Sequence, residues 1–116
     1  VAVDKAPLDP KVVAMANVSI RQESAFGLDP AGFGPVDWLF SDIICYPERL
    51  YRLVRTWLDK GLVKNFVCTI KFQGDTDHAT ASAFAAIPGA RVMHLFHNKH
   101  ELTWVLLRDE CQGTVA

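Results

Sequence analysis

Apolar positions along this chain follow two different periods, which predict helices and strands in turn. The clearest helix is predicted to begin near Pro47 and to end near Gly61, because apolar residues in this segment recur at helical spacing and form one stripe. The residues of the stripe are Leu50, Leu53, Val54, Trp57, Leu58 and Leu62. A weaker helical pattern covers residues 75–86 and is closed by Pro88 and Gly89.

Runs of β-branched and aromatic residues predict the strands. The run 66–70 does not alternate between apolar and polar residues, which is typical of a strand buried on both faces in a parallel sheet. Two later runs, 91–96 and 102–107, flank a polar stretch and predict a terminal antiparallel hairpin. Shorter strands are predicted at 1–3, 18–20 and 36–40.

The first third of the chain adds a short helix and a loop. Asp9 and Pro10 favour a helix start, with the carboxylate as the cap, and this helix is predicted to continue to Ala16. Glycines and prolines over 27–35 predict a loop. Strands that alternate with helices predict an open α/β fold with a mostly parallel sheet. Such sheets bind ligands outside the carboxyl ends of their strands.

Length and composition limit the class of protein. The chain has 116 residues and is 50% hydrophobic, which is enough for one domain at most. Apolar runs stay well short of the roughly 18 residues of a membrane span, so no membrane contact is expected. Cys45, Cys68 and Cys111 form no metal-ligand pattern with the histidines, so no metal is expected. Cys68 is predicted to be a small buried hydrophobe, and a reducing, cytoplasmic setting is expected.

Charged and aromatic residues add two expectations. The net charge is −1, but basic residues crowd one segment: Arg49, Arg52, Arg55, Lys60 and Lys64. Such a cluster is most often the solvated face of a helix, although with Tyr46 and Tyr51 beside it the segment could also contact RNA phosphates. Trp38, Trp57 and Trp104 lie in apolar periodic runs and are predicted to be in or near the core.

Candidate chemistry gathers at the predicted strand ends. Asp4 follows the first strand, Asp42 the third and Lys71 the fourth, while Glu101 precedes the last. Each residue alone could be a turn or helix cap. Because parallel strands bring their carboxyl ends to one edge of a sheet, we expect Asp42 and Lys71 to face a common crevice.

These residues lie within an ordered set of motifs that resembles a known family. The order of the motifs resembles that in FtsJ-like (RrmJ-type) ribosomal RNA 2′-O-ribose methyltransferases. The motifs are Val36–Asp42, Pro47 with its amphipathic helix, Thr69–Phe72 and His97–Thr103. The nearest resemblance is to the bacterial branch that methylates a guanosine ribose in large-subunit ribosomal RNA. It implies a Rossmann-like, S-adenosylmethionine-dependent methyltransferase fold, and a methyl group transferred to a ribose 2′-OH.

The resemblance also implies roles for individual residues. Asp42, Lys71 and Glu101 match three members of a Lys-Asp-Lys-Glu catalytic tetrad, and Asp42 would also lie near the cofactor. Asp4 matches the acid that binds the cofactor's ribose hydroxyls. Ser24 is at the position that usually contacts the adenine, and Glu23 could replace it if the loop shifts; these two residues complete the predicted cofactor set.

In that family the first lysine, the glycine-rich cofactor turn and the first strand all precede the residue that matches Val1. We therefore expect residues 1–116 to form a partial catalytic domain. Its missing central strand would come from an upstream segment of the same protein or from another chain.

Two other functions remain open on the sequence alone. One is a catalytically degenerate methyltransferase-like module that binds RNA or a protein partner. The other is an unrelated α/β binding domain of flavodoxin-like strand order, in which Asp4, Asp42 and Lys71 are only caps at strand ends.

Overall fold

A computed structural model describes residues 1–74 and 77–108. The elements are β1 (Ala2–Val3), α1 (Pro10–Val13), β2 (Ile20–Arg21), β3 (Val36–Ser41), α2 (Pro47–Asp59), β4 (Val63–Lys71), α3 (Asp77–Ala85), β5 (Ala90–Met93) and β6 (Glu101–Leu106). Two short 3₁₀ turns, Ala25–Gly27 and Pro30–Gly32, lie between β2 and β3. Every predicted element is therefore present, although several differ from the prediction in length.

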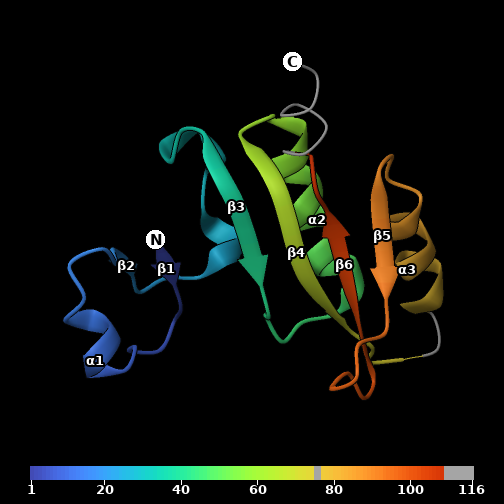
Figure 1. Cartoon of the computed structure of the whole chain (residues 1–116), viewed down its shortest axis with the longest axis horizontal. Coiled ribbons are helices and arrows are strands. Elements are labelled where there is room, and N and C mark those ends of the chain that lie inside the picture. The colour runs from blue at the N-terminus through green and yellow to red at the C-terminus, as the bar shows by residue number, and fades with distance from the viewer. Residues whose placement is uncertain (75–76, 109–116) are drawn as a thin grey trace.

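The main sheet has four strands in the order β3-β4-β6-β5 (Figure 1). β3 and β4 are parallel, and β6 is antiparallel to both of its neighbours, β4 and β5. Three of the four strands thus run in one direction, which confirms the α/β class, the mostly parallel strands and the terminal antiparallel hairpin. β6 lies between β4 and β5 instead of at the edge of the sheet, an arrangement that does not belong to a flavodoxin-like order.

The sequence of α2 contains the signals that begin and end it. Pro47 occupies the first turn, where its missing N–H costs no hydrogen bond, and Glu48 places a negative charge near the positive end of the helix dipole. Gly61 follows the helix with a φ of 68°, a conformation that favours glycine. Leu50, Val54 and other apolar residues of the predicted stripe are buried, so the helix packs against the sheet as its period predicts.

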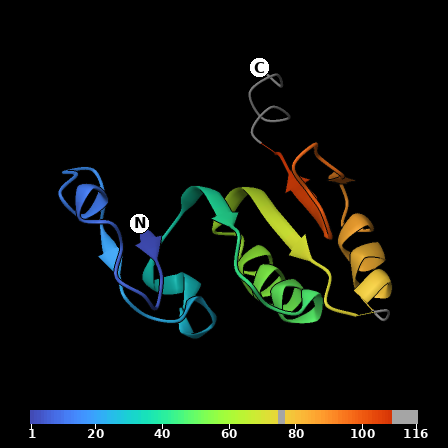
Figure 2. The same ribbon diagram turned by 90° about the horizontal axis from the view of Figure 1, so that it is seen from below.

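Helices α2 and α3 lie on the same face of the main sheet (Figure 2). Between them and the strands lies the core, in which Phe66, Phe84 and Trp104 are fully buried. The indole of Trp104 packs against both phenylalanine rings, and its Nε1–H donates to the carbonyl oxygen of Phe84 at 2.8 Å. Cys68 is also fully buried, as predicted, and burial raises the pKa of its thiol to about 12.

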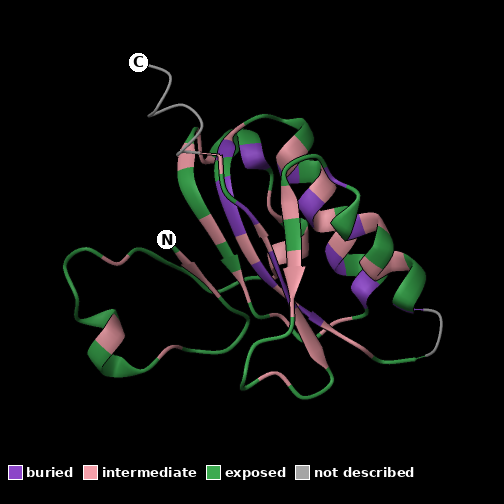
Figure 3. Ribbon diagram, turned by 45° about the vertical axis from the view of Figure 1, so that its right-hand side comes forward, coloured by how far each residue is buried: buried purple, intermediate pink, exposed green. Residues whose placement is uncertain are grey.

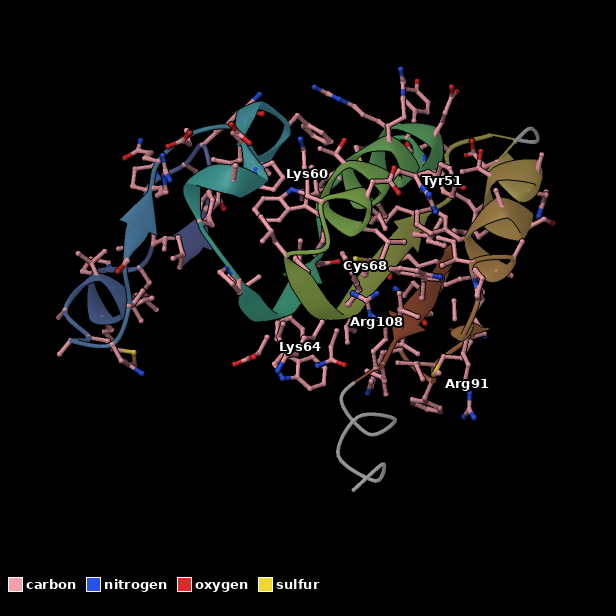
Figure 4. The ribbon with its side chains drawn as sticks, turned by 90° about the horizontal axis from the view of Figure 1, so that it is seen from above. Tyr51, Lys60, Lys64, Cys68, Arg91 and Arg108 are labelled. Carbon is pink, nitrogen blue, oxygen red and sulfur yellow. The ribbon has the colours of Figure 1, made fainter. Side chains whose placement is uncertain are left out.

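The opposite face of the main sheet carries no helix among the described residues. The strand register places Phe40, Val67, Val105 and Arg91 side by side on this face, and Figure 4 shows Arg91 projecting from it, away from the helices. Trp38 stacks on Phe40 there, with a ring distance of 5.5 Å, and remains 46% exposed. The prediction that Trp38 is in or near the core is therefore wrong, because the other side of the sheet is the one that the helices cover.

The N-terminal segment forms a separate two-stranded parallel sheet from β1 and β2. None of residues 1–29 is buried, and the burial colours of Figure 3 contrast this segment with β4, β6 and the helix faces. Asp9 caps α1 as predicted, accepting from the Lys11 N–H at 2.8 Å, but α1 ends at Val13 because no apolar face holds a further turn.

Two strand boundaries differ from the prediction. β4 begins three residues early, at Val63, because Val63 and Asn65 pair with Val36 and Trp38 of β3. Arg108 also donates hydrogen bonds to the main-chain carbonyls of Val63 and Lys64 (Figure 4). β5 ends early, at Met93, because the Asn98 side chain accepts from the Leu95 N–H at 2.8 Å and folds the chain into a loop.

Candidate active site

Three of the predicted site residues meet at one end of the main sheet. Lys71 is the last residue of β4, and the register pairs it with Glu101, the first residue of β6. Asp42 directly follows β3, whose last residue, Ser41, pairs with Cys68. The carboxyl ends of two parallel strands and the start of an antiparallel strand therefore bring together residues that are far apart in the sequence.

The Lys71 amine lies between the two carboxylates. Its Nζ is 3.1 Å from Oδ1 of Asp42 and donates to the main-chain carbonyl oxygen of Asp42 at 3.0 Å. The distance from Nζ to Oε2 of Glu101 is 4.0 Å. Two acceptors from a single residue thus fix the amine on the Asp42 side, while Glu101 remains the looser partner.

Exposure shows what this arrangement contributes. The Lys71 side chain is 16% exposed, whereas that of Asp42 is 79% exposed. An ion pair with such an exposed carboxylate stabilises a fold by about 1 kcal/mol or less. The arrangement therefore contributes little to stability, but it leaves an oriented amine beside a carboxylate that a ligand can reach.

An ion pair with Lys99 in the hairpin loop would give Glu101 a purely structural role. Within the described ranges, the ion pair that Glu101 forms is with Lys71. Nearby Cys45 is partly buried, and burial raises the pKa of its thiol despite the opposing positive charges of Arg49 and Lys71.

Three of the predicted cofactor residues closely follow the strands of the N-terminal sheet. Asp4 follows β1, and its Oδ1 accepts from the Ala6 N–H at 3.0 Å. Ser24 caps a 3₁₀ turn, with its hydroxyl oxygen accepting from the Phe26 N–H at 3.3 Å. Glu23 forms an ion pair with Arg21 at 3.0 Å, so its carboxylate already has a positively charged partner.

A pocket of about 280 Å³ opens beside Glu101, at the same end of the main sheet. Its lining includes Glu101 and the residue that follows Lys71; the full set is Phe72, His78, His94, Lys99, His100, Glu101 and Leu102. Sequence reasoning assigned these histidines no role, because they lie on three different segments and have no common spacing. No group of three or more His, Cys, Asp or Glu side chains suited to a metal ion occurs in the described part of the chain.

The basic segment has mixed surroundings. Arg49 lies over the ring of Phe26, with 3.8 Å from its guanidinium carbon to the ring centre, and Arg55 forms an ion pair with Asp59 at 2.7 Å. Tyr51 packs edge-on against buried Phe84, so its ring belongs to the helix interface. In the ranges that the structure describes, no helix is long and apolar enough to cross a membrane.

Comparison with known proteins finds relatives that are named ribosomal RNA methyltransferases. No family model matches the chain. Proteins named ribosomal RNA large subunit methyltransferase M match most of it: that of Azotobacter vinelandii is 29% identical over 92% of this chain and 33% of its own length. That of Shewanella frigidimarina is 26% identical over 88% of this chain and 31% of its own length. The Teredinibacter turnerae protein is 31% identical over 60% of this chain and 19% of its own length.

The chain thus spans about a third of the length of the first two of these relatives. The resemblance inferred from the sequence motifs is confirmed at the level of large-subunit ribosomal RNA methyltransferases, and the matched name differs from FtsJ itself. Over most of its length, this chain is a relative of the ribosomal RNA large subunit methyltransferases M.

Proposed function

We propose that this chain is part of an enzyme that transfers a methyl group from S-adenosylmethionine to a ribose 2′-OH of large-subunit ribosomal RNA. The observation that carries the proposal is the Lys71 amine, held 3.1 Å from the carboxylate of Asp42 and 4.0 Å from that of Glu101 at the strand ends. The names of the relatives support an RNA substrate.

The lysine suits the difficult part of this reaction. A ribose hydroxyl is a poor nucleophile, so its proton has to leave as its oxygen bonds to the methyl carbon. As a neutral amine, Lys71 takes that proton onto Nζ; as an ammonium, it stabilises the negative charge that develops on the oxygen. Asp42 orients the amine through its carboxylate and its main-chain carbonyl, and Glu101 holds the lysine or the ribose from the other side.

The residues fit the cofactor in chemical type. Asp4 uses Oδ1 to accept from the chain itself, which leaves its second oxygen for the ribose hydroxyls of the cofactor. Ser24 would contact the adenine, and it retains a hydroxyl proton and a lone pair for this, whereas Glu23 would first have to leave Arg21. When bound, S-adenosylmethionine supplies an electrophilic methyl group on a sulfonium that leaves as a neutral sulfide.

We further propose that residues 1–116 are a partial Rossmann-like domain and that a strand from upstream residues of the same protein lies between β1 and β3. Among the described residues, β1 pairs only with β2 and β3 only with β4, so both have an edge without a partner. Within residues 1–74 and 77–108, no helix covers the second face of the main sheet, although mostly parallel sheets are usually covered on both faces. The relatives, about three times as long, have ample sequence for these additions.

Hydrogen exchange tests this completion of the sheet. We expect the main-chain amides of β1 and β3 to exchange slowly in the complete protein and quickly in a chain limited to residues 1–116. The reason is that an unpaired strand edge leaves its N–H groups to water. Equal exchange in both samples would contradict the proposal. Protection that grows with protein concentration would assign the strand to a second chain.

The function itself is tested by methyl transfer with the complete protein. Unmodified large-subunit ribosomal RNA and S-adenosylmethionine with a labelled methyl group are expected to give labelled RNA. After alkaline hydrolysis the label should remain in alkali-resistant dinucleotides, because a 2′-O-methyl group blocks attack of that oxygen on the adjacent phosphate. Label that appears in mononucleotides would indicate methylation of a base instead. A protein that binds the RNA without any transfer would favour the catalytically degenerate module.

A further inference from the structure

The pocket beside Glu101 is lined by aromatic and basic side chains to which the proposed methyl transfer assigns no role. Glu101 belongs both to the ion pair and to the pocket wall, and Phe72 directly follows the lysine. The pocket therefore adjoins the candidate active site through Glu101. It lies on the β6 side of Lys71, whereas Asp42 lies on the β3 side.

The pocket lies apart from the residues proposed to bind the cofactor, so it is available to a different ligand. The proposed cofactor residues precede β3 in the chain or follow it directly, with Asp4 on the separate β1–β2 sheet. The pocket is built from the residue after β4, the start of α3, the loop between β5 and β6, and the first residues of β6. A molecule in this pocket thus lies on the Glu101 side of Lys71, away from Asp42.

The lining of the pocket favours a nucleotide. The rings of Phe72 and His78 lie 5.1 Å apart with an angle of 31° between their planes, and form an aromatic wall. Unpaired RNA bases stack on phenylalanine and histidine rings. Lys99 adds a positive charge for a phosphate, and His94 and His100 add groups that donate and accept hydrogen bonds. A volume of about 280 Å³ suits one small ligand unit better than a folded protein segment.

We infer that this pocket binds one unpaired nucleotide of the RNA next to the nucleotide whose ribose reaches Lys71. Its base stacks on Phe72 and His78, and Lys99 contacts a flanking phosphate. The pocket would thereby help to select the methylated position, because only RNA in which the neighbouring base can leave its stack fits the site. The inference rests on the proposed function insofar as RNA is the substrate.

Filter binding of unmodified large-subunit ribosomal RNA to the complete protein tests the inference. Phe72→Ala should weaken RNA affinity about tenfold at constant salt, the effect typical of one lost base stack, whereas Phe72→Tyr should retain wild-type affinity. Lys99→Gln should lower the slope of log affinity against log salt by about one, as for a lost phosphate contact. In methyl transfer, these losses should raise KM for RNA and leave kcat unchanged.

Lys11→Gln is the matched control, because Lys11 lies on α1, outside the pocket lining and outside the basic segment, and its replacement removes the same charge. It should leave RNA binding unchanged, and all variants should bind S-adenosylmethionine as the wild type does, which shows that they are folded. If the complete protein transfers methyl groups and Phe72→Ala binds RNA as tightly as the wild type, the inferred nucleotide pocket is wrong but the proposed function stands. If Phe72→Ala binds RNA more weakly but the complete protein transfers no methyl group, the nucleotide pocket is supported and the proposed function is wrong.

Discussion

Replacing Lys71 with alanine is expected to lower kcat for methyl transfer by about 10²–10⁴-fold, the range for a group that moves a proton in the transition state. The Nζ atom is the one that Asp42 and Glu101 hold, so its removal leaves two carboxylates with no cation between them. Binding of S-adenosylmethionine should be nearly unchanged, because the residues expected to hold the cofactor ribose and adenine lie on other elements. The measurement is single-turnover transfer to unmodified ribosomal RNA at saturating cofactor.

Lys71→Arg separates the two roles of the lysine. A guanidinium remains protonated and cannot accept a proton, but it keeps the positive charge. Activity as low as that of the alanine variant would assign Lys71 as the base, and partial activity would assign it to charge stabilisation. Lys64→Ala is the control, since Lys64 lies near the other end of the same strand, and it should retain wild-type kcat. Wild-type kcat in Lys71→Ala would contradict the proposed mechanism.

Replacing Trp104 with alanine is expected to destabilise the main sheet by about 3–5 kcal/mol. The indole is fully buried against Phe66 and Phe84, so its removal leaves a cavity, and the Phe84 carbonyl oxygen loses its hydrogen-bond donor. The change also loosens β6, whose first residue, Glu101, faces Lys71. Stability and the geometry of the site therefore depend on the same strand.

Native-state hydrogen exchange of peptides from β4 and β6 measures this effect in the complete protein, because the slowest amides report the free energy of opening. Trp104→Phe should cost less, since the smaller ring keeps part of the packing and loses the N–H donor. Phe96→Ala is the control: this ring is 95% exposed, so its removal should change the opening free energy by less than about 0.5 kcal/mol. An equal effect of Phe96→Ala and Trp104→Ala would contradict the described core.

The sequence predicts that Asp42 and Lys71 lie close together because both residues follow strand ends. Asp42 and Lys71 each follow an apolar run, and parallel strands deliver their carboxyl ends to one edge. Glu101 begins the last strand, so antiparallel pairing suffices to bring it opposite Lys71. The amphipathic stripe of α2 likewise determines which helix face is buried, since the helical period allows a single apolar side.

Other features depend on long-range arrangement that no local pattern encodes. Alternation along β3 predicts two faces but not which of them the helices cover, and this is why Trp38 is exposed. The end of β4 and the loop after β5 meet only because β6 inserts between these strands, so His78 and His94 share a pocket without any common spacing. The N-terminal start of β4 depends on β3, because Val63 pairs with Val36 across the sheet.

The position of β6 determines when this sheet can form during synthesis. Of the described strands, β6 leaves the ribosome last, and it occupies the interior of the sheet, between β4 and β5. Until residues 101–106 have emerged, β4 and β5 have no strand to join them, and the helices already made have only part of a surface to pack on. Contacts between segments so far apart in sequence slow folding. The nascent chain therefore keeps an apolar sheet edge open until translation of this region is almost complete, and Lys71 acquires its second carboxylate neighbour only at that last step.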